Sequence, residues 1–204
     1  MAMVWMLLVL TTIIGGSVWW AMVQKRKAQA NLQALARRLG LTPTEKMMND
    51  LELRGTVSAR EIRFWTYATG SGKSRVNWVA VLVETSTTHG LIFELRRQNL
   101  VTKVMEFFGS KEITVGDKAF DDAWFVQTNE PDFLRAALVP GIRAKLMDSL
   151  AAGAMGSFKC NGGAVSYAES GSFSSYPQCL RLEQQLAVLQ DLADLAEVVA
   201  GQKP

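Results

Sequence analysis

Three aspartates that lie close together in the sequence are the first candidates for chemistry. Asp117, Asp121 and Asp122 precede a strand that we expect to begin at Phe125. Carboxylates at this spacing could hold a metal ion or act as an acid/base pair. In turns, however, aspartates commonly accept hydrogen bonds from their own backbone, and hard-metal sites usually take more oxygen ligands from defined loop positions. We therefore interpret these carboxylates as structural and predict no metal site and no catalytic residue.

Other candidate residues resemble functional motifs without meeting their requirements. The tripeptide Gly72-Lys73-Ser74 matches the end of a phosphate-binding loop, but Tyr67 stands where the first glycine of that motif belongs, and no helix pattern follows. The single histidine, His89, cannot form a zinc site alone. Cys160 and Cys179 match no zinc or redox spacing, so we expect reduced, buried thiols, which could pair only outside the cytoplasm. We predict no cofactor.

The elements that would position these residues begin with an uncharged run near the N-terminus. Residues 3–23 contain no charged side chain and no proline. At about 1.5 Å per helical residue, the run is long enough to cross a hydrocarbon core of about 30 Å. It lacks the preceding cations and the following cleavage site that are typical of a signal peptide. We predict a retained transmembrane anchor over residues 1–24.

Charged and aromatic residues beside this run predict its orientation. Cations that flank a span tend to remain in the cytoplasm, and here they follow the span. Tryptophan favours the headgroup layer, and it occurs near both ends of the run. The predicted membrane-interface residues are Trp5, Trp19, Trp20, Lys25, Arg26 and Lys27. We predict a single-pass protein of the bacterial inner (cytoplasmic) membrane, with its N-terminus outside and its C-terminal domain in the cytoplasm.

Small residues inside the predicted span offer a surface for a second helix. Thr12 and Gly16 are one helical turn apart, and Gly15 lies in the neighbouring row. Because packing rather than hydrophobicity drives helix association in lipid, small side chains that allow close approach favour it. We predict a helix-docking face of Thr12, Gly15 and Gly16 for an integral membrane protein complex. The run contains no strict GxxxG motif. An equal alternative is therefore that the two glycines are simply tolerated in an anchor that docks no second helix.

Residues 25–46 form a predicted basic neck and linker. An apolar stripe with helical spacing predicts a helix that ends at Gly40, and Thr42-Pro43-Thr44 then predicts a linker. Six of the 22 lysines and arginines lie in this segment, so the rest of the chain is mildly acidic. This distribution suits contact with anionic lipid headgroups and gives no support to nucleic-acid binding. The neck helix could lie on the membrane, pack on the domain or pair with a partner.

Residues 47–204 are predicted to form one cytoplasmic α+β domain. Apolar residues with period two predict antiparallel strands joined by short loops, and Asn161-Gly162 predicts a hairpin turn. The expected strands lie within 51–57, 62–66, 76–82, 91–95, 125–126, 158–160 and 164–167. The expected helices are 99–108 (alternatively a wide loop), one capped by Asn129, 140–152 and 180–199. We expect the helices to pack on the sheet.

Two motifs in this domain carry a resemblance to a protein family. The first is Gly116-Asp117-x-x-Phe120-Asp121. The second is Asn129-Glu130-Pro131-Asp132-Phe133-Leu134, followed by Leu138, Pro140, Arg143 and Leu146 at helical spacing. Together they resemble uncharacterised bacterial membrane-anchored proteins with a single N-terminal span and a "GDxxFD" α+β domain. The resemblance covers about residues 50–200, and it implies a membrane anchor and an α+β fold but no catalytic residue.

These observations favour a non-catalytic role. We predict an accessory or structural subunit of a larger bacterial membrane protein complex, for example a respiratory or photosynthetic one. The alternative is a membrane-tethered sensor that binds a lipid or small ligand between sheet and helices. A large apolar pocket near Trp65, Trp78 and Trp124 would favour it, although aromatic residues on strands are more often core. A membrane-anchored enzyme is a third hypothesis, and it would require Asp117, Asp121 or His89 to converge in a cleft with other polar groups.

Overall fold

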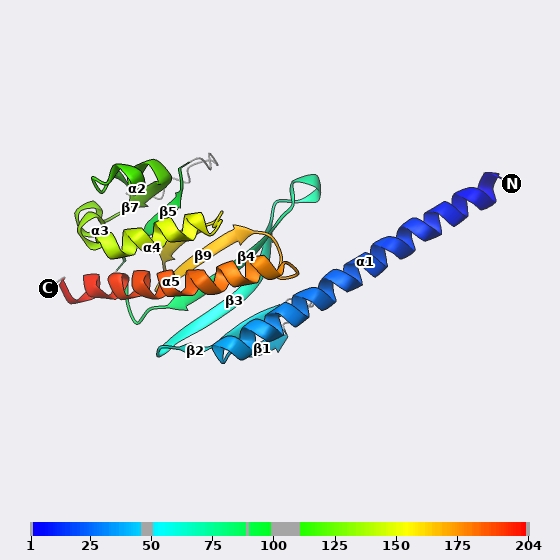
Figure 1. The fold of residues 1–204 in the computed structure, drawn as a ribbon, viewed down its shortest axis with the longest axis horizontal. Helices are drawn as coiled ribbons and strands as arrows, with labels where there is room; N and C mark the ends of the chain where they lie inside the picture. The colour runs from blue at the N-terminus through cyan, green and yellow to red at the C-terminus, as the bar shows by residue number, and fades with distance from the viewer. Residues whose placement is uncertain (1, 46–50, 89, 99–110, 203–204) are drawn as a thin grey trace.

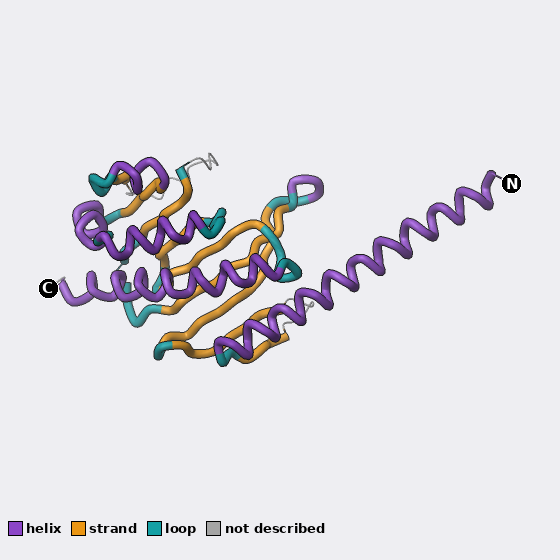
Figure 2. The backbone as a smooth tube through the Cα atoms, in the orientation of Figure 1, coloured by secondary structure: helices purple, strands orange, loops and turns teal. Residues whose placement is uncertain are grey.

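The computed structural model describes residues 2–45, 51–88, 90–98 and 111–202. They form an α+β fold in which helices pack on one face of an antiparallel sheet (Figure 1). The N-terminal helix extends far beyond the domain, and the two termini lie at opposite ends of the long axis (Figure 2). The predicted fold class of the domain, an antiparallel sheet packed by helices, is confirmed.

Nine strands of the described residues form a single sheet in the spatial order β1-β2-β3-β4-β9-β8-β5-β7-β6. Every neighbouring pair is antiparallel. The strands are β1 (Thr42–Glu45), β2 (Leu51–Val57), β3 (Arg60–Thr69), β4 (Val76–Glu84), β5 (Phe93–Arg97), β6 (Lys111–Ile113), β7 (Trp124–Thr128), β8 (Ser157–Asn161) and β9 (Ala164–Ser170). The period-two pattern therefore identified most of the strands.

Three features of the sheet differ from the sequence prediction. Strand β6, at one edge of the sheet, was not predicted. Thr42-Pro43-Thr44, predicted as a linker, belongs to strand β1 at the edge of the sheet, where the missing N–H of a proline is tolerated. The strand after β4 in sequence, β5, is not its neighbour in space. The β8–β9 hairpin lies between them, because β9 pairs with β4 and β8 pairs with β5. Such pairing joins segments far apart in the chain, which local alternation does not encode.

Four shorter helical elements and one long helix follow the first helix. They are the 3₁₀ turn η1 (Gly72–Ser74) and the helices α2 (Lys118–Ala123), α3 (Pro131–Ala137), α4 (Pro140–Ala151) and α5 (Tyr176–Gln202). The prediction that Asn129 caps α3 is wrong, because the N-cap residue is Glu130. The Asn129 side chain instead accepts a hydrogen bond from the Ile92 N–H and donates one to the Gly90 carbonyl, both at 2.8 Å. The element predicted over 99–108 lies outside the described residues.

The hydrophobic core lies between the sheet and its helices. Inward-facing residues of the strands alternate with more exposed ones, as in β3, where Ile62 and Phe64 are buried. The ring centroids of Phe158 and Tyr167, from the β8–β9 hairpin, are 4.8 Å apart. Helix α5 crosses β4 and β9 and buries Leu182, Leu189, Leu192 and Ala196. The prediction that the C-terminal helix packs across the sheet is confirmed.

Helix α1 (Ala2–Leu39) is continuous, so residues predicted as span and as neck belong to one element. Its N-terminal half extends away from the domain (Figure 1). Within the part of the chain that the structure describes, no helix is both long enough and apolar enough to cross a membrane. The predicted N-terminal helix is present from Ala2 onward, but the described residues do not identify it as a transmembrane anchor.

The C-terminal half of α1 packs on the domain. Its buried residues are Leu32, Leu35 and Ala36. The side-chain amide of Asn31 donates a 2.8 Å hydrogen bond to the carbonyl of Phe173, in the loop between β9 and α5. Arg38 forms a 2.8 Å ion pair with Glu183 of α5. Of the three arrangements open to the neck helix, the structure shows packing on the domain.

Candidate functional site

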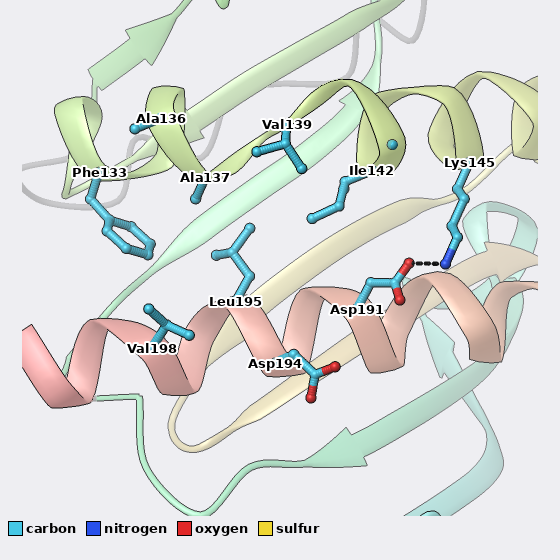
Figure 3. Close-up of a pocket in the computed structure, with 11 residues that line it drawn as sticks. Phe133, Ala136, Ala137, Val139, Ile142, Lys145, Asp191, Asp194, Leu195 and Val198 are labelled. Carbon is cyan, nitrogen blue, oxygen red and sulfur yellow. Dashed lines mark hydrogen bonds and ion pairs between the residues drawn. The ribbon is translucent and has the colours of Figure 1, made fainter.

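A largely apolar groove lies between the α3–α4 pair and the C-terminal half of α5, with a volume of about 620 Å³. Val139 and Ile142 point toward it from one wall, and Leu195 and Val198 point toward it from the other (Figure 3). Phe133 lies at one end (Figure 3). The lining residues are Phe133, Ala136, Ala137, Val139, Gly141, Ile142, Lys145, Asp191, Asp194, Leu195 and Val198.

Charged residues lie at the end of the groove opposite Phe133. Lys145 of α4 and Asp191 of α5 form a 2.5 Å ion pair that connects the two walls (Figure 3). Asp194 points away from the groove (Figure 3) and pairs with Arg60 at 2.6 Å. The charges are therefore neutralised within the protein, and the rest of the lining can receive an apolar group.

The two walls of the groove expose aliphatic side chains to solvent. Val139 is 49% exposed and Val198 is 55% exposed, whereas Leu195 is buried and forms part of the core. Apolar surface that is rimmed by polar residues is typical of binding sites for proteins or ligands. The arrangement can bind an apolar side chain, one face of a helix or a small apolar molecule.

The local sequence explains why Val139 is exposed. A residue that precedes proline is disfavoured in the helical region, and Val139 precedes Pro140. Its backbone is extended, with φ of −62° and ψ of 160°, so it interrupts the helical stretch between α3 and α4. Pro140 then occupies the first turn of α4, where its missing N–H breaks no helical bond. The break turns an aliphatic side chain toward α5 instead of into the core.

Two of the three candidate aspartates, Asp117 and Asp121, bond to the backbone of the turn around α2. Asp117 is the N-cap of α2, where its carboxylate accepts a hydrogen bond from the Phe120 N–H at 3.3 Å. The carboxylate of Asp121 accepts from the N–H groups of Val115 at 2.9 Å and Gly116 at 3.1 Å. These backbone bonds are what we predicted for aspartates in a turn.

Charged partners complete the surroundings of these aspartates. Asp117 pairs with Arg143 of α4 at 3.6 Å, and Asp122 pairs with Lys118 at 2.7 Å. Among the described residues, no group of three or more histidines, cysteines, aspartates or glutamates is placed to hold a metal ion. None of the three aspartates lines the groove.

Two other sequence candidates have different outcomes. Gly72-Lys73-Ser74 forms the exposed turn η1 at the tip of the β3–β4 hairpin, and strand β4 follows it, as predicted. His89 lies outside the described residues.

The two cysteines are free thiols inside the core. Cys160 and Cys179 are both fully buried. Each thiol points at a backbone carbonyl, with Sγ to oxygen distances of 3.5 Å to Leu91 and 3.4 Å to Phe173. Burial raises the pKa of Cys160 to about 12 and that of Cys179 to about 11. Both thiols therefore remain protonated at neutral pH, as expected of structural cysteines.

A buried carboxylate network was missed by sequence analysis. Glu169 of β9 is 1% exposed, and one of its oxygens accepts from Gln178 at 2.8 Å and from Arg181 at 2.9 Å. The other oxygen accepts from the Tyr167 hydroxyl at 2.7 Å. The signal in the sequence is the inward phase of β9, which begins with Val165 and places Glu169 in the core. Its donors come mainly from α5, so only the fold reveals them.

The predicted membrane residues lie on the part of α1 that extends beyond the domain. Trp5, Trp19 and Trp20 are exposed, and so are Lys25, Arg26 and Lys27. Thr12, Gly15 and Gly16 are exposed as well. A Cβ atom added at either glycine would meet no atom within 4 Å in the described structure. The helix-docking face therefore remains a prediction, with room for a partner.

The three tryptophans proposed for a ligand pocket do not share one. Trp124 is buried in the core, with its ring 5.8 Å from that of Phe158. Trp65 lies outside this core, on the face of β3 opposite the buried Phe64. Trp78 is opposite Tyr67 of the same face. None of the three tryptophans lines the groove.

Comparisons with known proteins identify the fold. No family model matches the chain, and no curated protein matches it either. A crystal structure of the mycobacterial trehalose monomycolate transport factor A, TtfA, matches with a TM-score of 0.58 and 8% sequence identity. The fold resembles that of TtfA. The match covers 84% of this chain and 93% of the TtfA chain, so the likeness extends over the domain rather than one motif.

The TtfA match supports the α+β fold and gives no information about the groove residues of this chain. At 8% identity, the residues of the groove cannot be transferred from TtfA. The resemblance to proteins with a "GDxxFD" element rests on the motifs alone, because no family model supports it.

Proposed function

We propose that this chain is a membrane-anchored accessory factor of a transport assembly and that its domain binds a protein partner of that assembly. The observation that carries the proposal is the groove between α3–α4 and α5, where Val139 and Val198 remain half exposed. Exposed apolar side chains that gather in one groove with polar residues at its rim are typical of a binding surface. A partner helix that laid an apolar face into the groove would remove both from water.

The membrane anchor is proposed from the sequence. Residues 3–23 are uncharged, tryptophans occur near both ends of the run, and residues 25–27 are all cationic. The proposed location is the bacterial inner membrane, with the domain in the cytoplasm. Within the anchor, the exposed face of Thr12, Gly15 and Gly16 would contact a helix of the same assembly.

The kind of assembly is proposed from the TtfA likeness. TtfA is a transport factor for trehalose monomycolate, and its fold spans most of the present chain. This favours a transport assembly, with a lipid-linked cargo as the first class to examine. A respiratory or photosynthetic assembly has no comparable support.

A binding role is favoured over catalysis by how the acidic residues are used. The carboxylates of Asp117 and Asp121 accept bonds from backbone N–H groups. Glu169 is held by three side-chain donors in the core. These groups hold the fold together, and general acid/base chemistry would need one of them to reach a substrate.

The proposal is tested by extracting native membranes in a mild detergent and separating complexes by size. The full chain should co-migrate in stoichiometric amount with an integral membrane assembly, identified by mass spectrometry. Val198→Glu should abolish co-migration, because it places a charge in the groove. Gly16→Leu should weaken co-migration by blocking close approach of a second helix.

A matched control tests the groove specifically. Met155 is 50% exposed and lies outside the groove lining, so Met155→Glu should leave co-migration intact. Migration of the wild-type chain alone as a small particle would contradict the proposal. Equal retention by Val198→Glu and Met155→Glu would remove the groove from it.

A second candidate function is binding of a small apolar ligand, and the volume of the groove favours it. The groove measures about 620 Å³, within the range of about 300–1,000 Å³ that is typical of ligand sites. Lipid extraction of the purified full chain, followed by mass spectrometry, distinguishes the two. A bound lipid that is lost in Val198→Glu and retained in Met155→Glu would support this second function.

A further inference from the structure

The β3–β4 hairpin forms an arm that extends past α4 and α5 (Figure 1). Strand β3 ends at Thr69 and strand β4 begins at Val76, and the turn η1 between them forms the tip (Figure 1). Residues 62–83 contain three cations and no acidic residue. Arg63 is paired with Glu52 at 2.7 Å, so the unpaired positive charge of the arm lies at its tip, although the domain as a whole is mildly acidic.

Aromatic side chains cover one face of the arm. Tyr67 lies directly opposite Trp78, and their rings stack with centroids 6.1 Å apart and an interplanar angle of 10°. Trp65 continues the row on the same strand, 6.3 Å from Tyr67, and the guanidinium of Arg63 lies 5.0 Å from the Trp65 ring. Tyr67 is exposed, and the two tryptophans are half-buried. The face resembles the amphipathic aromatic surfaces that favour a membrane–water interface.

The tip of the arm supplies the positive charge. Lys73 and Arg75 are exposed, and neither forms an ion pair with a described residue. Arg75 also borders a hollow of about 270 Å³, together with Asn77 and Ser172. A guanidinium, an amide and a hydroxyl at one hollow suit a phosphate oxygen.

The arm points toward the same end of the molecule as the N-terminal half of α1. Along the long axis, the tip is the part of the domain that reaches furthest in that direction (Figure 1). Ala28 of α1 already packs against the core, and the uncharged run ends at Val23. At about 1.5 Å per residue, only about 8 Å of helix separates the two, close to the thickness of one headgroup layer. A domain held this near a bilayer lies within reach of its phosphates.

We propose that the β3–β4 arm is a second membrane contact, in which Lys73 and Arg75 bind phosphates of anionic lipids while Tyr67 and Trp78 lie at headgroup level. The inference rests on the proposed anchoring of α1, because α1 sets the height of the domain. The occupant is the headgroup layer of the bilayer that holds α1. Charge complementarity with an anionic surface and the short distance along α1 select this occupant.

The test uses a fluorophore at the tip of the arm in the full chain, reconstituted into vesicles. Ser71→Cys can be labelled selectively, because both native thiols are buried. The vesicles contain phosphatidylcholine, with or without phosphatidylglycerol, and a lipid with a nitroxide on its headgroup as quencher. We expect strong quenching of the Ser71 label with phosphatidylglycerol and weaker quenching without it. Lys118→Cys, on the distal helix α2, should show little quenching in either.

Charge-neutralised variants test the role of the cations. Lys73→Gln with Arg75→Gln should weaken the contact by about 25-fold, because each surface cation contributes about fivefold at an anionic membrane. The matched pair, Lys111→Gln with Lys118→Gln, makes the same charge change at exposed positions outside the arm and should leave quenching of the Ser71 label unchanged.

Extraction with alkaline carbonate separates this inference from the proposed anchoring. A chain that resists extraction, with a Ser71 label quenched no more than the Lys118 label, would overturn the arm contact and keep the anchor. An extracted chain with a label that is still quenched by anionic vesicles would support the arm contact and overturn the anchor. An extracted chain with an unquenched label would overturn both. Tighter binding of the arm to an RNA oligonucleotide than to anionic vesicles would also overturn the inference, in favour of nucleic acid.

Discussion

The hydroxyl of Tyr167 donates a 2.7 Å hydrogen bond to the carboxylate of Glu169, two residues further along β9 on the same buried face. The same hydroxyl accepts a 3.0 Å bond from the N–H of Gly156. Burial, and then the negative charge of Glu169, raise the pKa of Tyr167, so the hydroxyl remains a donor at neutral pH. A buried acid is thereby tolerated in the core.

Replacing this hydroxyl should destabilise the domain. Tyr167→Phe keeps the ring that packs on Phe158 and leaves the N–H of Gly156 and one oxygen of Glu169 without this partner. The expected loss in the free energy of unfolding is about 1–3 kcal/mol. Urea denaturation of the full chain in detergent measures it. Tyr67→Phe, at an exposed tyrosine, should change the free energy by no more than about 0.5 kcal/mol.

Low pH should weaken the ion pair that joins Arg60, at the start of β3, to Glu197 of α5. Glu197 accepts hydrogen bonds from Arg60 at 2.7 Å and from the Ser86 N–H at 2.8 Å. These bonds, led by that of Arg60, lower the pKa of Glu197 from its ordinary value of 4.5. The unfolded chain therefore takes up this proton first as the pH falls. The stabilisation is complete above pH 4.5 and is lost as the pH falls through the lower pKa of the folded state.

The variant Glu197→Gln isolates this contribution. Wild type should be more stable than the variant at neutral pH, and the difference should shrink as denaturation curves are measured at successively lower pH below 4.5. A difference that stayed constant, or grew, would show that the Glu197 carboxylate does not titrate in this way.

Removing a buried side chain from the C-terminal half of α1, which packs on the domain, should destabilise the whole domain. Leu35 is fully buried between α1 and the core, so Leu35→Ala should cost about 2–5 kcal/mol through lost burial and the cavity left behind. The neighbouring Gln33 is exposed, and Gln33→Ala should have little effect. Denaturation monitored by circular dichroism gives both values. Equal midpoints for Leu35→Ala and wild type would show that α1 does not fold cooperatively with the domain.

The two thiols should report unfolding. Cys160 and Cys179 are buried, and burial raises the pKa of each, so a thiol reagent meets neither thiolate in the native state. We expect no modification of the native full chain and modification of both cysteines in denaturant, at a rate limited by opening of the fold. Rapid modification of either cysteine in the native state, measured by mass spectrometry, would contradict this placement.

The sequence allowed the strands to be predicted better than their order. Alternation in β3 and β4 is a local property, and the two strands are neighbours in both chain and space. The position of β9 beside β4 depends on pairing between Val81 and Tyr167, which are far apart in the chain. Strand β1 was missed because Pro43 reads as a strand breaker, and only its place at the edge makes it acceptable.

The candidate site was predicted less well, for a physical reason. The groove forms where Val139, between α3 and α4, and Val198 of α5 lie on facing walls, although they are far apart in sequence. Whether such an apolar residue is covered depends on how distant segments pack, and no local sequence pattern encodes that packing. The roles of Asp117 and Asp121 were predicted correctly, because an aspartate in a turn bonds to backbone within a few residues.

Because α1 is one continuous helix, its N-terminal half and the domain are rigidly connected. Its 38 residues span about 57 Å without a proline, and Gly15 and Gly16 are the places where such a helix would bend most easily. Because Asn31 and Arg38 hold the C-terminal half of α1 against the domain, a bend at these glycines would change the orientation of the groove relative to the N-terminal half. A partner that bound both the N-terminal half of α1 and the groove would therefore couple the angle of the helix to the position of the groove.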